Sequence, residues 1–325
     1  MMTPPPERPV PPLSAAAPGH GRSVGGRRRG AGKRFLVVGD VLDGVLVQTS
    51  ARTTGDHDPA AVIRHRPAGA AGAAATWLGW LGAEVDLVGR VGVDDVYRHE
   101  RALEDAGVRP RIGYDSRTST GAVVSVRSSV GRTSMSDGGA SALLGADDVP
   151  LDLVQRADVV HLTGAAMLGS GGPERIAALV TLARSGGARV ALDPSSVAVV
   201  RSIGGAAFLA AIAGVDVLMP GHDEALALTG ASDVVDAAAE LTRHVPLVLV
   251  TRGSEGVVIA RPGRTPQPVP ATPATVVDTL GAGDAFAAGF LRAWATDAVR
   301  VGAATREGTR VAARALGFVG GRPPV

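Results

Sequence analysis

The chain has 325 residues, of which 45% are hydrophobic and 20% charged, so it can bury a sizeable core and global disorder is excluded. The absence of cysteine excludes disulfides, thiolate metal sites and cysteine nucleophiles. The formal net charge is +2, but seven Lys or Arg residues against one Glu lie in residues 1–34. The remainder is therefore mildly acidic, and we expect it to bind neither nucleic acid nor, without a long apolar stretch, a membrane.

The first segment, residues 1–33, is rich in Pro, Gly and Arg and lacks any apolar period. Such a composition is typical of a disordered tail. The segment has no continuous apolar stretch of the kind that a secretory signal requires, so we expect a cytoplasmic protein. The basic residues 27–34 could contact RNA or a membrane, but a solvated extension is the simpler interpretation.

From residue 35 onward, short apolar runs alternate with helical patterns. The run RFLVV has the form of a buried strand that ends at Gly39, and a turn-rich stretch after it could supply strands of a small second sheet. The predicted strands in this part are residues 35–38, 45–51, 60–66 and 84–92, and the predicted helices are residues 70–81 and 95–107.

The alternation continues downstream. The predicted strands are residues 120–126, 132–136, 157–164, 188–194, 215–221, 246–253 and 256–261, and the predicted helices are residues 173–184, 223–228, 234–242 and the run from Ala285 onward. This spacing predicts an α/β fold with a mainly parallel sheet covered on both faces. In such sheets ligands bind beyond the carboxyl ends of the strands, where Gly39, Gly164, Asp193, Gly221 and Gly253 fall.

The stretch VVDTLGAGDAFAAGF, residues 276–290, has two interpretations. It could be an ordinary glycine turn with Asp284 as a helix cap. It could also be an anion-binding helix start, because Gly281, Ala282 and Gly283 carry almost no side chain and their N–H groups can approach a phosphate closely. A carboxylate at the same place suits phosphoryl transfer to an alcohol, since it can take the proton of the attacking hydroxyl.

At this point a resemblance becomes clear. DTLGAGDAFAAGF, residues 278–290, resembles the C-terminal signature of the PfkB family of carbohydrate kinases, in the ribokinase-like superfamily. LGAEVDLVGRVGVDD, residues 81–95, resembles the family's N-terminal signature. Further blocks occur in the family's order over residues 35 to about 317: LVVGD, TGAVVSV, VALDP, VLMPGHDEALALTG and VLVTRGSEG.

The resemblance implies a three-layer α/β/α ribokinase-like domain over residues 34–320, with a small β lid whose strands fall within 43–66 and 112–136. It implies an ATP-dependent kinase that phosphorylates a hydroxymethyl group of a sugar, nucleoside or related polyol. It further implies Mg²⁺ and, in some members, a monovalent cation such as K⁺. A homodimer formed through the lid is compatible with it, but the sequence does not decide the oligomeric state.

The resemblance also assigns roles to residues. Asp284 matches the general base, and Gly281, Ala282 and Gly283 match the anion hole. Glu224 matches the acidic end of an Asn-x-x-Glu motif that organises Mg²⁺ through water. The residues on the nucleotide side are Thr251, Arg252, Gly253, Ser254, Gly256 and Thr279. Asp278 matches a position that in some members helps to hold a monovalent cation. Without the resemblance, the TRGSEG run could be a plain turn and Glu224 a helix-start residue favoured by the helix dipole.

The substrate side departs from the family pattern. The family's substrate-binding aspartate would fall at Gly44, and Asp43 sits one residue early, where an extended chain points its carboxylate the other way. Ala73 stands where the family has a sugar-binding asparagine, and Gly221 where it has the Asn of Asn-x-x-Glu. Asp40, Asp43 and Gly69 are the candidate substrate-binding residues that remain, and His222 and Asp223 could substitute in part.

Three functions are therefore compared. The first is the kinase, for which the intact anion hole and Asp284 argue. The second is a family member with little or no turnover that binds a nucleotide or sugar as a sensor, for which the altered substrate side argues. A dinucleotide oxidoreductase could cite GAAGAAA at residues 69–75, but this run does not follow a strand and has the wrong glycine spacing.

Overall fold

A nine-stranded sheet forms the centre of the computed structural model, which describes residues 32–50, 60–129, 131–164 and 171–324. Its strands are β1 (Arg34–Val38), β4 (Glu84–Gly92), β5 (Val108–Asp115), β8 (Val159–Thr163), β9 (Arg189–Asp193), β10 (Val217–Leu218), β11 (Val248–Thr251), β12 (Val257–Arg261) and β13 (Arg264–Val269). The spatial order is β13-β12-β11-β10-β9-β8-β1-β4-β5. The strands from β11 to β5 run parallel, and β12 and β13 are antiparallel to their neighbours.

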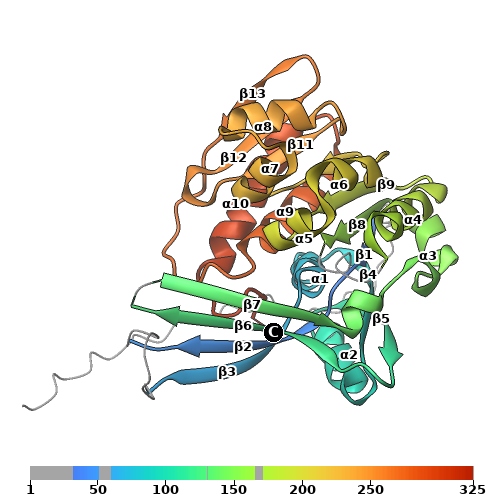
Figure 1. Ribbon diagram of the computed structural model, residues 1–325, viewed down its shortest axis with the longest axis vertical. Helices are drawn as coiled ribbons and strands as arrows, with labels where there is room; N and C mark the ends of the chain where they lie inside the picture. Colours follow the sequence, from blue (N-terminus) through green and yellow to red (C-terminus); the bar gives the residue numbers. More distant parts are fainter. Residues whose placement is uncertain (1–31, 51–59, 130, 165–170, 325) are drawn as a thin grey trace, which may run out of the picture. The chain divides into compact units, whose positions relative to one another are not determined.

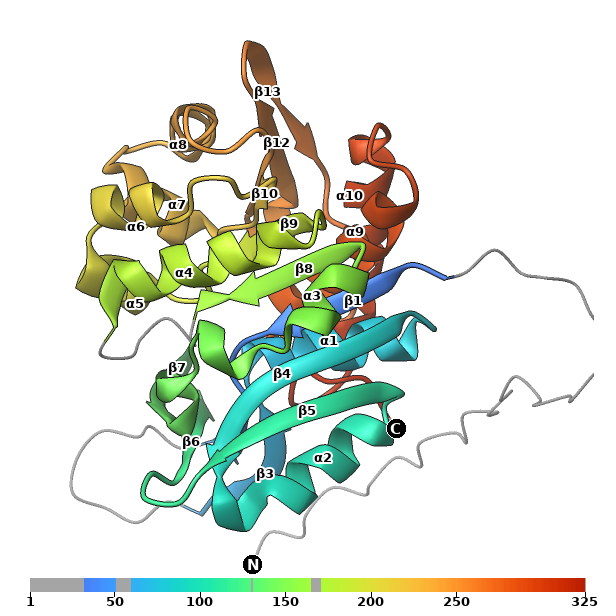
Figure 2. The same cartoon turned by 90° about the vertical axis from the view of Figure 1, so that its right-hand side faces the viewer.

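Helices cover both faces of this sheet (Figures 1 and 2). Along β1, Leu36 and Val38 pack into one hydrophobic cluster while Phe35 and Val37 pack into the other, as the two-residue period of a strand requires. The first cluster is covered by α3 (Leu151–Arg156), α4 (Gly172–Ser185), α5 (Val197–Ile203), α6 (Gly205–Ala211), α7 (His222–Thr229) and α8 (Val234–Leu241). The second is covered by α1 (Ala70–Trp80), α2 (Val96–Glu104), α9 (Ala282–Thr296) and α10 (Val301–Ala315). The predicted three-layer α/β/α fold is confirmed.

A smaller, four-stranded sheet of order β3-β2-β6-β7 accompanies the large one. Its strands are β2 (Leu42–Gln48), β3 (Val62–Ala68), β6 (Thr120–Ser128) and β7 (Gly131–Gly139), which lie side by side in the lower part of Figure 1. Arg127 donates a hydrogen bond to the carbonyl of Val277, and Arg132 Nη1 donates one to Thr279 Oγ1 at 3.0 Å. These bonds join the small sheet, called the lid below, to the loop that precedes α9.

The predicted elements and the described structure do not coincide everywhere. Residues 1–31, most of the predicted disordered tail, lie outside the described residues, as do residues 51–59 within the first predicted lid segment. The strands β5 and β13 and the helix α10 were not among the predicted elements, although each pairs with or packs on a predicted one. Within the described ranges, no helix is both long and apolar enough to cross a lipid bilayer.

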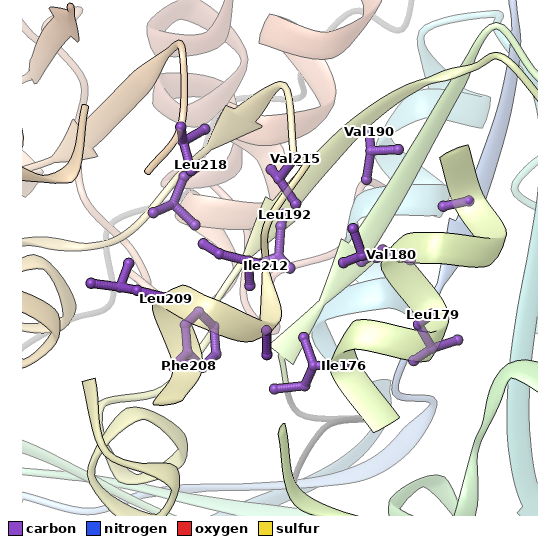
Figure 3. Packing of buried hydrophobic residues seen from close by; sticks show 14 of the residues in the cluster. Ile176, Leu179, Val180, Val190, Leu192, Phe208, Leu209, Ile212, Val215 and Leu218 are labelled. Atoms are coloured by element: carbon purple, nitrogen blue, oxygen red, sulfur yellow. The ribbon is translucent and has the colours of Figure 1, made fainter. Parts of the chain in front are cut away.

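The core on the α4–α6 side of the sheet is shown in Figure 3. Phe208 of α6 is fully buried there, in the same cluster as Ile176 of α4 and Leu192 of β9. Because protein interiors are close-packed, removal of a buried ring leaves a cavity that neighbouring side chains fill incompletely.

We expect Phe208→Ala to lower the free energy of unfolding by about 3–5 kcal/mol, as buried Phe→Ala changes generally do. Urea unfolding followed by circular dichroism measures this loss. Val299→Ala is the control, because this side chain is 86% exposed and its truncation should change stability by less than about 0.5 kcal/mol. Similar losses for the two variants would contradict the described core.

Candidate active site

A cleft of about 430 Å³ opens at the carboxyl ends of the central strands. Four carboxylates line it, and they come from separate elements: Asp40 follows β1, Asp193 ends β9, Glu224 lies in the first turn of α7, and Asp284 lies in the first turn of α9. The lid contributes Val123, Arg132, Ser134 and Ser136 to the same cleft. The structure therefore brings together the acidic residues that the sequence singled out separately.

The N-terminus of α9 faces this cleft. Gly281 is the N-cap residue with a φ of 72°, in the left-handed region that glycine adopts without strain, and its carbonyl accepts a hydrogen bond from Ala285 N at 2.9 Å. The helix thus starts at Ala282, three residues earlier than predicted, and Asp284 is inside its first turn instead of capping it. First-turn N–H groups have no intrahelical partner, so this end of α9 can donate to an anion.

Gly283 marks the most open point of this turn. A Cβ atom placed on Gly283 would have no heavy atom within 4 Å, which means that the position faces free space. Gly283 lines the cleft together with Asp284, and it also lines a second cavity.

The second cavity has a volume of about 710 Å³ and a largely apolar wall. Five of the residues predicted to lie on the nucleotide side line it: Thr251, Gly253, Ser254, Gly256 and Thr279. Val257, Val276, Ala312 and Leu316 supply apolar wall of the kind that a flat aromatic base requires. Thr251, Gly283 and Phe286 line both cavities, so the two cavities meet at the start of α9.

Two residues predicted to bind the nucleotide or a monovalent cation are placed elsewhere. Arg252 Nη1 bonds Glu255 Oε2 at 2.9 Å, within the turn that follows β11. Asp278 accepts hydrogen bonds from the backbone N–H of Leu280 and of Gly320, both at 3.1 Å, and it thereby fixes loop geometry. Neither side chain lines either cavity.

Residues 320–322 complete the cleft. Trp77 Nε1, inside α1, donates a hydrogen bond to the carbonyl of Gly321 at 2.9 Å. A Cβ atom on Gly281 would lie 2.5 Å from the Cα of Gly321, so the two backbones touch directly. The next residue, Arg322, lines the cleft and donates from Nη2 to the carbonyl of Ala68 at 2.8 Å. Sequence reasoning missed Arg322, because GGRPPV carries no motif, although paired glycines before a charged residue are a signal of close backbone contact.

Burial, and after it repulsion from neighbouring carboxylates, raises the pKa values of three of the carboxylates. Burial, followed by the nearby Asp193 and Asp40 carboxylates, raises the pKa of Asp284 well above its usual range, and Arg322 opposes this in part. Burial and then Glu224 raise the pKa of Asp193. Burial likewise raises the pKa of Glu224, against the hydrogen bond from Gly221 N. Groups with raised pKa values in a cleft are typical of sites that move protons.

Asp40 and Asp43 have different surroundings. Asp40 lines the cleft, but its carboxylate accepts hydrogen bonds from Ala70 N at 2.8 Å and Thr163 Oγ1 at 2.9 Å, and so holds the start of α1. Asp43 does not line the cleft, because its carboxylate is bound by Arg98 at 2.6 and 2.9 Å. The one-residue displacement has thus turned Asp43 away, and we leave it out of the site.

The other substrate-side candidates are placed as follows. Gly69 and Ala73 line the cleft, so the position of the missing asparagine is a methyl group on the cleft wall. His222 and Asp223 do not line it, since they are exposed and bond each other at 2.8 Å. Ser195, which was not predicted, lines the cleft with a φ of 61°, a strained value for a residue other than glycine.

Glu224 and Asp193 are the residues that could hold a metal ion. One Glu224 oxygen accepts from Gly221 N at 2.7 Å, and the other is free of that bond. No group of three or more potential metal ligands occurs among the described residues. Mg²⁺ characteristically keeps several waters and uses one or two carboxylates with substrate phosphates, so this pair of unneutralised carboxylates fits such an ion.

Comparison with known proteins shows which protein family the chain matches. A sequence model described as pfkB family carbohydrate kinase matches residues 33–324. The ATP-dependent ribose-1-phosphate kinase of Halopiger xanaduensis is 32% identical over 276 residues, which cover 81% of this chain and 86% of that protein. The bifunctional protein HldE of Caulobacter vibrioides is 30% identical over 309 residues, which cover 89% of this chain but 60% of HldE. The chain thus spans less than two thirds of that relative.

Solved structures show the same fold. Adenosine kinase from Sinorhizobium meliloti superposes with a TM-score of 0.79 at 24% identity, over 91% of this chain and 97% of that one. Ribokinase from Arabidopsis thaliana, complexed with ribose and ATP, superposes with a TM-score of 0.72 at 24% identity, over 89% of this chain and 94% of that one.

The raised pKa of Asp284 leads to a prediction on stability. The folded protein holds this proton to a higher pH than the unfolded chain, so the free energy of unfolding falls as pH rises from 3.8 through the raised pKa. We expect Asp284→Asn to raise the melting temperature at pH 8, by about 2–4 °C for each kcal/mol relieved.

The gain should shrink towards pH 4, where the wild-type carboxyl is already protonated when folded. Asp105→Asn, at an exposed carboxylate next to α2, is the matched control and should show no such pH-dependent gain. Differential scanning calorimetry at a series of pH values measures both. A lower melting temperature for Asp284→Asn at pH 8 would show that the carboxylate is stabilised where it lies.

Proposed function

Because the chain belongs to the pfkB family of carbohydrate kinases, we propose that it transfers the terminal phosphoryl group of ATP to a hydroxymethyl group of a sugar, nucleoside or related small polyol. One observation carries this proposal: the carboxylate-lined cleft, called the acceptor cleft from here on, and a largely apolar cavity meet at Gly283, beside Asp284 and at the α9 N-terminus. Such a junction suits an acceptor on one side and a nucleotide on the other, with the phosphoryl group between them.

Asp284 would act as the general base. The acceptor hydroxyl gives its proton to the Asp284 carboxylate, its oxygen forms the new bond to phosphorus, and the bond from phosphorus to the β-phosphate oxygen breaks to release ADP. A base is most effective when its pKa lies near the working pH, and burial beside Asp193 and Asp40 shifts the pKa of Asp284 in that direction.

The first turn of α9 would stabilise the phosphoryl group in transit. Its N–H groups, at Gly281, Ala282 and Gly283, lie at the positive end of a fifteen-residue helix. They are fixed before the reaction begins, so they stabilise developing negative charge without reorganisation.

Glu224, with Asp193 nearby, would hold Mg²⁺ through water. When bound, the ion neutralises phosphate charge during transfer. Burial raises the pKa values of both carboxylates, and the charge of Glu224 raises that of Asp193 further, so a cation beside them would stabilise their charged forms.

Thr251, Gly253, Ser254, Gly256 and Thr279 would bind the nucleotide. Arg252 and Asp278 are left out, because their side chains are engaged outside the cavity. The backbone bonds to Asp278 and the Arg132 guanidinium at 3.8 Å give no support to a K⁺ site there, so the proposal contains none.

A homodimer through the lid is proposed because Ile63 of β3 and Met135 of β7 are exposed. A cytoplasmic location also stays a proposal.

A second function, a sensor that binds ligand with little turnover, is favoured by one observation. Ala73 places a methyl group where a polar contact to the sugar is expected, and a lost contact to a substrate hydroxyl costs about 1–3 kcal/mol. The test is ADP production by purified protein with MgATP and a panel of sugars, nucleosides and polyols. ADP above the acceptor-free background supports the kinase, and silence across the panel with ATP still bound supports the sensor.

We expect Asp284→Asn to lower kcat about 10²- to 10⁴-fold, the usual contribution of a general base. The affinity for ATP should stay within about twofold, because Asp284 lines the acceptor cleft and not the nucleotide cavity. Steady-state kinetics and calorimetric titration with ATP measure the two quantities. Full activity in the variant would remove Asp284 from the proposed mechanism.

Gly283→Ala tests the junction itself. The added methyl group meets no atom within 4 Å, so the fold should tolerate it, yet it would occupy the space where the two cavities meet. We expect kcat/KM to fall by at least about tenfold, equivalent to ~1.4 kcal/mol, with an unchanged or higher melting temperature.

Gly302→Ala is the matched control. Gly302 is likewise the second residue of its helix, α10, and its new methyl group also has room, but it lines neither of the two cavities. The control should keep wild-type activity. Equal activity of the two variants would argue against phosphoryl transfer at Gly283.

A further inference from the structure

The acceptor cleft contains a guanidinium group that no motif predicts. Arg322 Nη2 donates to the carbonyl of Ala68 at 2.8 Å, and its Nε atom is buried without a hydrogen-bond partner among the described residues. In the part of the chain that the structure describes, no carboxylate oxygen lies within 4.0 Å of the Arg322 guanidinium, so Arg322 forms no ion pair there. A guanidinium has five N–H donors, so the protein leaves most of this group's hydrogen-bonding capacity unused.

The position of Arg322 is built into the fold. A Cβ atom on Gly72, in α1, would lie 2.3 Å from Arg322 Nη2, so any larger residue there would displace the guanidinium. The hydrogen bond from Trp77 to Gly321 fixes the backbone immediately before it. Ala73, the next residue of α1, is where the usual polar contact to the substrate is missing. Arg322 therefore supplies a charged group beside the position that lost a neutral one.

The carboxylates in the cleft do not neutralise Arg322. Asp40 already accepts hydrogen bonds from Ala70 N and Thr163 Oγ1. Asp284 and Asp40 do favour the charged form of Arg322, but burial outweighs them and lowers its pKa to about 10, which still leaves it protonated at neutral pH. A largely buried cation without a partner is costly, and an incoming anion removes that cost.

The lid adds donors of the same kind on its own side of the cleft. Ser134 and Ser136 of β7 line the cleft, and both carry hydroxyl groups. Arg132 of the same strand also lines it, bonded to Thr279 Oγ1 at 3.0 Å. Among the described residues, Arg322 and Arg132 are thus the two guanidinium groups in a cleft that four carboxylates also line, so an anionic group of an acceptor has a cationic partner there.

We propose that Arg322 is a specificity-determining residue that binds an anionic group of the acceptor, so that the substrate is a sugar or polyol carrying a phosphate ester or carboxylate besides its free hydroxymethyl group. This inference rests on the proposed kinase function. The planar fork of arginine matches phosphate and carboxylate oxygens bidentately, which a neutral hydroxyl cannot reproduce. With a phosphate ester as acceptor, the product is a bisphosphate, and ADP is the leaving group as before.

Three kinds of acceptor with a free hydroxymethyl group separate the possibilities: neutral ribose and fructose, the phosphate esters ribose 1-phosphate and fructose 1-phosphate, and the acids ribonate and gluconate. We expect kcat/KM for one anionic class to exceed that for the neutral sugars by about 10- to 100-fold, the range for a charge-assisted contact. The class with the higher kcat/KM shows whether the anionic group that Arg322 binds is a phosphate ester or a carboxylate.

Variants at Arg322 test the residue. Arg322→Gln should reduce this preference to about onefold, while Arg322→Lys, which keeps the charge but loses the fork, should retain part of it. Arg243→Gln, at an exposed arginine paired with Glu240 beyond α8, is the matched control and should keep the full preference. Melting temperatures show whether each variant is folded. If Arg322→Gln does not fold, the preference of the wild-type protein for anionic over neutral acceptors still tests the proposal.

Binding of ribose 1-phosphate and of ribonate, measured by calorimetry without ATP, separates this inference from the kinase function. If either ligand binds the wild type but not Arg322→Gln while no acceptor yields ADP, the anion site stands and the kinase function fails. This inference is overturned, and the kinase function stands, in either of two cases. In the first, kcat/KM for the neutral sugars equals that for the anionic acceptors. In the second, Arg322→Gln keeps the wild-type preference.

Discussion

The acceptor cleft depends on a direct contact between two backbone turns. Gly281 and Gly321 have φ values of 72° and 74°, and a side chain on either one would strike the backbone of the other. This contact holds the start of α9 in place, and it also carries Arg322 into the cleft. One steric requirement therefore positions both the amides that we propose to bind phosphate and the Arg322 guanidinium.

The sequence predicted the parts of this site that depend on local chain geometry. Alternating strands and helices indicate a parallel sheet, and a parallel sheet gathers its strand ends at one edge, which is why Asp193, Glu224 and Asp284 meet. The small residues of the GAGD turn predicted an open helix start, and the structure leaves Gly283 free on its outer side. The one-residue shift of Asp43 predicted a carboxylate that points away, and Asp43 indeed pairs with Arg98.

The sequence could not predict contacts made by residues far apart in the chain. Arg322 follows a pair of glycines in a short segment without periodicity, and its place in the cleft depends on the space above Gly72, which no local pattern encodes. The start of α9 was also predicted three residues late, because the small residues GAG have the composition of a turn, whereas the structure places Ala282 and Gly283 inside the helix. The pKa of Asp284 likewise could not be predicted, because it depends on burial, on the neighbouring carboxylates and on Arg322, which surround Asp284 only in the folded chain.

The bond between Trp77 and Gly321 joins residues 244 positions apart, and this separation bears on how the protein is made. On the ribosome, β1, Asp40 and α1 emerge first, and the segment that closes the cleft emerges after nearly all of the remaining chain described here. Until residue 322 has been translated, a nascent chain lacks the bond from Trp77 to Gly321, the contact of Gly321 with Gly281 at the start of α9, and the Arg322 guanidinium. The cleft can therefore close only when synthesis of the described chain is almost complete.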